Sequence, residues 1–390
     1  MSAAPDKRPT PKGKGTKGAA PAAAAGAAAT AVAGAALYLT EENLGKLVAE
    51  IVAGGTRLVA PASEPQAGVG GSADYRYISS AAELAFGDSL PRMSLKGFFL
   101  PQSEVLFKWH RKGADVEIEA VPTEFPPQIV LGARPCDTAA LEIVDQVMDW
   151  GLRDELWFGR RDATTIFNLS CPVEDASCFC HAVGLNPDAT RAADGMLTPV
   201  PGGYLVETCT EKGAALIEGH KALFESGGDT GAAAQRSEAA AQYRADARAK
   251  VAADLQIDTT RIKEWVGDHF DDEFWTALGP RCNGCAACAS VCPTCHCFDI
   301  VDEPEGVGHG ARRRNWDTCQ TGVFTLHASG HNPRADQNSR FRQRVNHKFF
   351  IYPSRFGEVL CTGCGRCSRV CPEGQDLAEV LACIDELARA

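Results

Sequence analysis

Hydrophobic residues in the first half of the chain follow two spacings, one typical of strands and the other of helices. In LYLTEENLGKLVAEIVAGG, Leu44 and Leu47 fall on one helical face, and Thr40 stands before two glutamates as an N-cap does. The runs PPQIVLGARPC, DATTIFNLSC and GGYLVETCT are typical of buried strands. Helical patterns follow at DTAALEIVDQVMDW, which we expect Asp137 to cap, and at GAALIEGHKALFE. This alternation predicts an α/β domain over residues 37–225.

The pattern changes after residue 225. The segment AAAQRSEAAAQYRADARAKVAADL is rich in alanine and charge, which predicts a helical linker at residues 226–257. RIKEWVGDHFDDEFWTAL is amphipathic and aromatic, and it leads into a cysteine-rich segment that we assign to a mainly helical last domain, residues 258–390. Residues 1–36 are low in complexity, so we expect a disordered tail, with an export or targeting signal as the alternative.

Charge and composition narrow the classes of function. The chain of 390 residues carries a formal net charge of −11, which argues against nucleic-acid binding because a basic surface is missing. The sequence contains no convincing membrane span. It has 17 cysteines, with none before Cys136. Disulfide frameworks belong to small secreted chains, so we expect a cytoplasmic, metal-binding protein.

Two cysteine runs share one spacing, Cys-x2-Cys-x2-Cys-x3-Cys-Pro, starting at Cys282 and at Cys361. Bacterial ferredoxins carry this pattern, and in two-cluster ferredoxins the fourth cysteine of a run ligates the other cluster. We therefore predict two [4Fe–4S] clusters. One would be held by Cys282, Cys285, Cys288 and Cys371, and the other by Cys361, Cys364, Cys367 and Cys292.

Zinc and reduced structural thiols are the alternatives for these runs. Structural zinc usually takes paired Cys-x2-Cys units from separate knuckles, which this spacing fits poorly. Three nearby cysteines, Cys295, Cys297 and Cys319, have no place in the two-cluster scheme. They are interpreted as packing or hydrogen-bonding thiols, with a further cluster or a redox role left open.

A second set of cysteines follows the predicted strands of the α/β domain. Because the carboxyl ends of parallel strands meet at one edge of a sheet, these thiols could converge there. Four thiolates suffice for a third [4Fe–4S] cluster, and buried or redox-sensitive thiols are the alternative. The set consists of Cys136, Cys171, Cys178 and Cys180.

A basic run precedes the second ferredoxin motif, in SRFRQRVNHKFF. It is either a solvated face, or a surface that docks an acidic partner or raises a cluster potential by positive charge. Its cations are Arg340, Arg342, Arg344 and Lys348. The chain shows no P-loop and no nucleophile elbow, and it offers no catalytic residue.

These motifs together resemble a known family. The order GARPCD, CPVEDASCFC, CNGCAACASVCPTCHCFDI, WDTC, FTLHASGHNPR, NHKFFIY and CTGCGRCSRVCP is similar to the iron–sulfur beta subunit of cytosolic [NiFe] hydrogenases, or sulfhydrogenases. It is equally similar to the corresponding iron–sulfur subunit of anaerobic sulfite reductase. The resemblance implies an electron-transfer role between a flavin-bearing NAD(P)H subunit on one side and a catalytic subunit on the other. It also implies that the cysteines of PCD and CPVEDASCFC hold the third cluster.

Two further alternatives stay open. One is a zinc-stabilised scaffold that only assembles partners. The other is a chain that itself binds flavin in its α/β domain.

Overall fold

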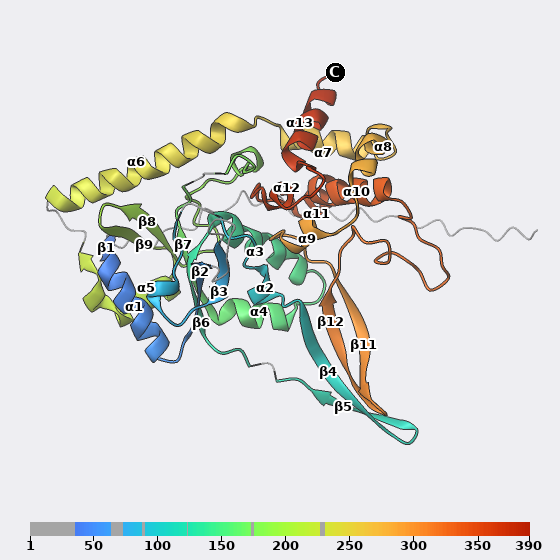
Figure 1. Cartoon of the computed structure of the whole chain (residues 1–390), viewed down its shortest axis with the longest axis horizontal. Helices are drawn as coiled ribbons and strands as arrows, with labels where there is room; N and C mark the ends of the chain where they lie inside the picture. The colour runs from blue at the N-terminus through green and yellow to red at the C-terminus, as the bar shows by residue number, and fades with distance from the viewer. Residues whose placement is uncertain (1–35, 64–72, 88–89, 123, 173–174, 227–230) are drawn as a thin grey trace, which may run out of the picture.

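The computed structural model describes most of the chain after the N-terminal segment, and all structural statements refer to that part (Figure 1). Its ranges are 36–63, 73–87, 90–122, 124–172, 175–226 and 231–390. Nearly all of the expected N-terminal tail therefore lies outside the described residues. The described chain forms a large mixed sheet with helices on both faces, a group of helices rich in cysteine loops, and a projecting smaller sheet.

The larger sheet has eight strands in the order β10-β1-β9-β8-β7-β6-β2-β3. Its strands are β1 (Leu37–Thr40), β2 (Arg57–Ser63), β3 (Ala73–Tyr77), β6 (Gln128–Ala133), β7 (Thr164–Leu169), β8 (Gly195–Val200), β9 (Gly203–Thr208) and β10 (Glu225–Ser226). Strands β2, β6, β7 and β8 run parallel, and the outer strands pair antiparallel. The α/β expectation is confirmed in this mixed form, which large sheets often take.

Helices cover both faces of this sheet. On one face, α1 (Glu41–Ala53) and α5 (Glu211–Gly219) pack their apolar sides over β1, β2, β7 and β9. On the other, α2 (Lys96–Phe99), α3 (Pro135–Met148) and α4 (Glu155–Asp162) cover β2, β6 and β7. The predicted cap of α1 is confirmed, because the Thr40 side chain accepts a hydrogen bond from the amide of Asn43.

The predicted cap of α3 is wrong. The helix begins at Pro135, and Asp137 lies in its first turn with its side chain buried. Proline is favoured at the first helical position because its missing N–H has no partner there in any case. The Asp137 carboxylate is instead hydrogen-bonded by Arg366 and by the Tyr75 hydroxyl. A long-range ion pair has replaced the local cap.

Helices dominate the rest of the chain. The predicted linker helix is α6 (Gly231–Asp254), which spans from the larger sheet to the C-terminal helices (Figure 1). The others are α7 (Thr259–Asp268), α8 (Phe274–Leu278), α9 (Ala287–Ser290), α10 (Gln337–Asn346), α11 (Tyr352–Phe356), α12 (Arg366–Arg369) and α13 (Leu377–Leu387). A π-helical turn, His347–Ile351, joins α10 to α11. Aromatic residues such as Trp265, Trp275 and Phe349 form the core between these helices.

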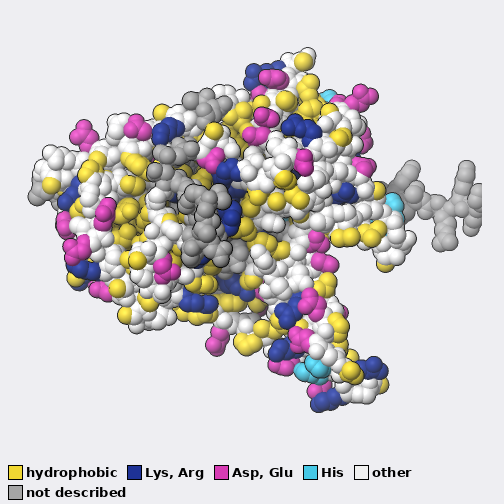
Figure 2. Space-filling view, viewed as in Figure 1, with side chains coloured by type: hydrophobic (Ala, Val, Ile, Leu, Met, Phe, Trp, Pro, Cys, Tyr) yellow, Lys and Arg dark blue, Asp and Glu magenta, His cyan; other side chains and the backbone are white. Residues whose placement is uncertain are grey.

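A four-stranded sheet departs from the sequence expectation. Its strands are β4 (Ser103–Lys112), β5 (Asp115–Ala120), β11 (Phe298–Gly306) and β12 (His309–Trp316), in the order β11-β12-β4-β5. We call this sheet the arm, because it projects from the body (Figure 1). Charges of both signs lie along it (Figure 2), with cross-strand pairs such as Arg312 with Asp302. The arm joins one hairpin from each predicted main domain, so the last domain is not helical throughout.

Among the described residues, no helix combines the length and the apolar character that crossing a membrane requires.

Candidate iron–sulfur sites

Thiols from both ferredoxin-type runs meet at one cavity between the C-terminal helices. It is lined by one cysteine of the first run and three of the second, namely Cys292, Cys361, Cys364 and Cys367. The ferredoxin spacing predicted this set, with its fourth cysteine supplied by the other run. The chain reaches this geometry through Gly363 and Gly365, whose φ values of 61° and 67° are left-handed and favour glycine. We call this cavity the central site.

The other predicted ligand set joins the same two runs at the surface. The Asn283 side chain donates a hydrogen bond to Glu373, and the Arg281 guanidinium donates one to the Gly374 carbonyl, so the loop before Cys285 lies against the loop after Cys371. Nearby, the Gln337 amide donates to the Cys282 sulfur at 3.1 Å. We call this region the outer site. Ligation by Cys282, Cys285, Cys288 and Cys371 stays a prediction.

Two cations of the basic run are buried beside the central site. Lys348 is 3% exposed, and its amine donates to the Cys292 sulfur at 3.4 Å and to Thr294 Oγ1 and the Leu360 carbonyl at 2.9 Å each. Three acceptors for one amine match the three donors of an ammonium group. Burial by itself lowers the pKa of Lys348, but the nearby thiolates outweigh it and raise that pKa. The solvated-face interpretation is therefore wrong for Lys348.

Arg344 gives the clearest sign that the central site accommodates an anion. Its side chain is 5% exposed and lines the cavity, yet Nε and Nη2 have no hydrogen-bond partner among the described residues. The Thr362 hydroxyl, in the same lining, is also without one. A buried cation without a counter-charge is strongly unfavourable. A cluster with four thiolate ligands is anionic, so these residues fit it.

A second cavity lies at the carboxyl edge of the larger sheet. It is lined by the four cysteines of the α/β domain, Cys136, Cys171, Cys178 and Cys180. Cys136 follows β6 and Cys171 follows β7, which pair in parallel. The predicted convergence of these thiols at one edge is thus present. We call this cavity the inner site.

The inner site is buried and its thiols are poor acids without a metal. Burial raises the pKa of Cys136 and raises that of Cys180 to about 12. Such thiols stay neutral near pH 7 unless a bound metal displaces their protons. The remaining lining is largely apolar, including Leu90, Leu185 and Pro187. A dry pocket of thiols suits a cluster shielded from water.

The central and inner sites share a wall. Gly363 and Cys364 line the inner site, and Cys364 also lines the central site. The Phe179 amide donates to the Gly363 carbonyl at 2.8 Å. A Cβ on Gly363 would lie 2.5 Å from the Phe179 carbonyl, so only glycine allows the two cysteine loops to pack this closely. The two sites are therefore direct neighbours.

A buried ion pair joins the two halves at this wall. The Arg366 guanidinium donates two hydrogen bonds to the Asp137 carboxylate, at 2.9 and 2.7 Å, and a third to the Pro91 carbonyl. Both side chains are at most 1% exposed. Bidentate geometry of this kind offsets the desolvation of both charges. No local pattern indicated this pair, because its partners are 229 residues apart.

The three unassigned cysteines lie next to the central site. The Cys295 thiol is hydrogen-bonded with Cys292, and the Cys297 thiol with Cys319. Sequence reasoning also missed Lys96, a 4% exposed lysine whose amine donates to the Ala289 carbonyl at 3.2 Å. Its neighbours in the sequence do not mark that lysine, because its contacts come from a distant segment.

No group of three or more His, Cys, Asp or Glu side chains in the described part is gathered as tightly as the ligands of a single metal ion. The cysteines of the central and inner sites are arranged around cavities instead.

Comparison with known proteins agrees with this geometry. Residues 281–375 match the family model of the 4Fe-4S dicluster domain, so the C-terminal part of the chain is an iron–sulfur domain of that class. The chain is also similar to sulfhydrogenase 2 subunit beta of Pyrococcus furiosus, with 27% identity over 310 residues. The alignment covers 79% of this chain and 88% of that protein, which confirms the resemblance predicted from the motifs. No solved structure matches the chain.

Proposed function

We propose that this chain is the electron-transfer subunit of an oxidoreductase complex and that it binds three [4Fe–4S] clusters. The observation that carries the proposal is the wall of Gly363 and Cys364 between the central and inner sites, because it makes two cysteine-lined cavities immediate neighbours. The dicluster domain and the sulfhydrogenase beta relative support the same class. When bound, each cluster supplies a one-electron carrier.

Twelve cysteines would hold the clusters. The proposed ligands are Cys282, Cys285, Cys288 and Cys371 at the outer site, Cys361, Cys364, Cys367 and Cys292 at the central site, and Cys136, Cys171, Cys178 and Cys180 at the inner site. The chain itself contributes burial, which excludes water, and cations that offset negative charge. Lys348 and Arg344 act at the central site. Arg366 acts at the wall to the inner site.

The proposed division of labour follows the predicted domains. Residues 258–390 would hold the outer and central clusters, and residues 37–225 the inner cluster, with residues 226–257 linking the two. Electrons would enter at one end of this series and leave at the other. Seventeen cysteines, twelve of them proposed as ligands, suit a reducing compartment such as the cytoplasm.

For partners, we propose a flavin-bearing NAD(P)H subunit on one side and a [NiFe]-type catalytic subunit on the other. The name of the sulfhydrogenase relative favours this assignment. The iron–sulfur subunit of an anaerobic sulfite reductase is the alternative, and it differs in its partner more than in this chain. Neighbouring reading frames separate the two, since one case requires hydrogenase subunits and the other a siroheme-type subunit.

Anaerobic iron and sulfide analysis tests the cluster count. Three cubanes give about twelve irons per chain and the dicluster pair alone gives about eight. The Cys136→Ser variant should lose about four irons. The matched control is Cys209→Ser, a buried cysteine that lines neither cavity. It should keep all twelve, and an unchanged iron content in Cys136→Ser would refute the inner cluster.

The same preparation tests the zinc-scaffold alternative. Iron–sulfur protein is brown, with broad thiolate-to-iron absorption that fades on reduction. Colourless anaerobic protein with stoichiometric zinc would overturn the electron-transfer proposal altogether.

A further inference from the structure

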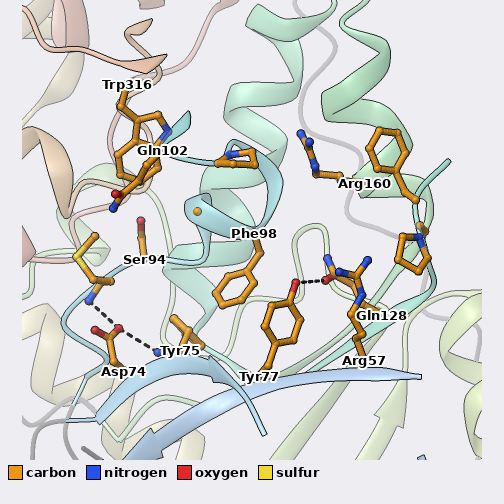
Figure 3. A pocket seen from close by; sticks show the side chains of 16 residues that line it. Arg57, Asp74, Tyr75, Tyr77, Ser94, Phe98, Gln102, Gln128, Arg160 and Trp316 are labelled. Atoms are coloured by element: carbon orange, nitrogen blue, oxygen red, sulfur yellow. Dashed lines mark hydrogen bonds between the residues drawn. The ribbon is translucent and has the colours of Figure 1, made fainter. Parts of the chain in front are cut away.

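A large cavity lies apart from the cysteine sites, at the end of the larger sheet that carries β3 (Figure 3). Its volume is about 490 Å³, within the range of small-molecule sites. Its walls come from β2, β3, β6, α2, α4 and the residue that ends β12. The proposed electron-transfer function does not use it.

Aromatic rings form much of the wall. Tyr77 and Phe98 meet edge to face, with ring centroids 5.3 Å apart. Phe125 lies beside the Arg160 guanidinium, and Trp316 closes the opposite side (Figure 3). Such surfaces suit a flat heteroaromatic ring, which can stack on them or meet their edges.

Two arginines lie away from Trp316. Arg160 is partly engaged, because it donates to Glu104 at 2.8 Å and to the Phe99 carbonyl at 3.1 Å. Arg57 forms no ion pair or hydrogen bond with the described residues, and its guanidinium lies 5.7 Å from the Tyr77 ring centroid. An unneutralised guanidinium beside an aromatic wall suits the phosphate of a ligand.

A buried hydroxyl supplies independent evidence that a ligand belongs here. Ser94 is 4% exposed and lines the cavity, and its Oγ has no hydrogen-bond partner among the described residues. Buried polar groups are normally paired, so such a group calls for an explanation. Gln102 lies on the same side of the cavity as Ser94 (Figure 3), so both could address ring nitrogens or carbonyls.

We propose that this cavity binds a mononucleotide, with its ring among the aromatic side chains and its phosphate at Arg57. Two kinds of mononucleotide share this chemistry. A flavin mononucleotide would be a redox ligand. Trp316 packs under the amine of Lys96 at 4.0 Å, and Lys96 contacts the first cysteine run. An adenine mononucleotide would be a regulatory ligand instead.

Binding to the full-length anaerobic protein tests the proposal. Calorimetric titrations would use FMN and AMP, with riboflavin and adenosine as matched probes without phosphate. At least one mononucleotide should bind once per chain, about tenfold or more tighter than its nucleoside, as expected for a charge-assisted contact. Tighter FMN identifies the redox ligand, and tighter AMP the regulatory one.

Three variants locate the contacts. Arg57→Gln should abolish the preference for the phosphorylated probe, while Arg236→Gln should retain it. Arg236 is also placed over a tyrosine ring, that of Tyr38 on β1, far along the sheet from β3. Ser94→Ala should weaken binding about three- to tenfold without lowering thermal stability, because that hydroxyl has no partner to lose among the described residues.

Two results would overturn the proposal. One is the absence of saturable 1:1 binding by both FMN and AMP. The other is an unchanged phosphate preference in Arg57→Gln, whose fold can be checked by circular dichroism.

Discussion

Replacing Lys348 by methionine should lower the reduction potential of the central cluster by on the order of 100 mV. The amine has three acceptors, which identifies it as an ammonium group, and one of them is the sulfur of a proposed ligand, Cys292. Reduction adds a negative charge to the cluster, and a nearby positive charge favours that form. Methionine keeps the length and apolar stem of the side chain and removes the charge.

The magnitude follows from the distance. The amine is 3.4 Å from the Cys292 sulfur. A metal–thiolate bond adds about 2.3 Å, so the charge is roughly 6 Å from the metal. At an effective dielectric constant of about 20, one unit charge then contributes about 3 kcal/mol. For one electron that is about 120 mV, and sharing of the electron over the cubane reduces it to roughly 60–120 mV.

The assay is a potentiometric titration followed by electron paramagnetic resonance under anaerobic conditions. One cluster signal should shift to lower potential in Lys348→Met, and the other signals should shift much less. Lys348→Arg retains the charge and should shift little, and Lys108→Met removes an exposed lysine of the arm and should shift nothing. Unchanged potentials in Lys348→Met, or an equal shift in Lys348→Arg, would refute the electrostatic reasoning.

Three further predictions concern the wall between the sites and the buried histidine beside Lys348. Arg366→Met leaves Asp137 buried without its bidentate partner, and should lower the free energy of unfolding in urea by about 3–5 kcal/mol; a loss below about 1 kcal/mol would argue against the pair. Gly363→Ala places a methyl group 2.5 Å from the Phe179 carbonyl, so it should separate the cysteine loops and release about four irons. Full iron content in that variant would show that the loops do not touch. Burial lowers the pKa of His347 to about 3, below the value of about 6.5 in an unfolded chain. The unfolded chain therefore takes up a proton that the folded chain excludes, and stability should fall as the pH drops below about 6.5. Urea midpoints of His347→Gln should fall less steeply over that range, and parallel curves would contradict the assignment.

Local sequence signals predicted the features that depend on neighbouring residues. The cap at Thr40 and the strand ends before Cys136 and Cys171 follow from short patterns, and the structure has them. The spacing of the two cysteine runs anticipated which thiols share the central cavity. These signals work because a few consecutive residues determine each of them.

Features that depend on distant partners escaped prediction. Asp137 was assigned to a cap, but Arg366 claims its carboxylate from the other end of the chain. The hairpin of β11 and β12 carries charges on most positions and lies largely exposed, so it lacks the apolar alternation that marks a strand. Its pairing with β4 supplies the order that the local pattern does not indicate.

Burial of the basic run also depends on distant segments. Arg344 and Lys348 are four residues apart and therefore share a helical face. Their spacing is visible in the sequence, but it does not tell whether that face meets water or thiols. The first cysteine run and the segment around Leu360 decide this by closing over Lys348.

The most direct test is diffraction from anaerobically grown crystals at wavelengths on either side of the iron absorption edge. Iron should give three compact anomalous peaks, one inside the thiols of Cys136, Cys171, Cys178 and Cys180, and two at sites that each combine three cysteines of one ferredoxin run with the fourth of the other. Peaks at the zinc edge, an empty inner cavity, or a run that supplies all four ligands to its own cluster would contradict this arrangement.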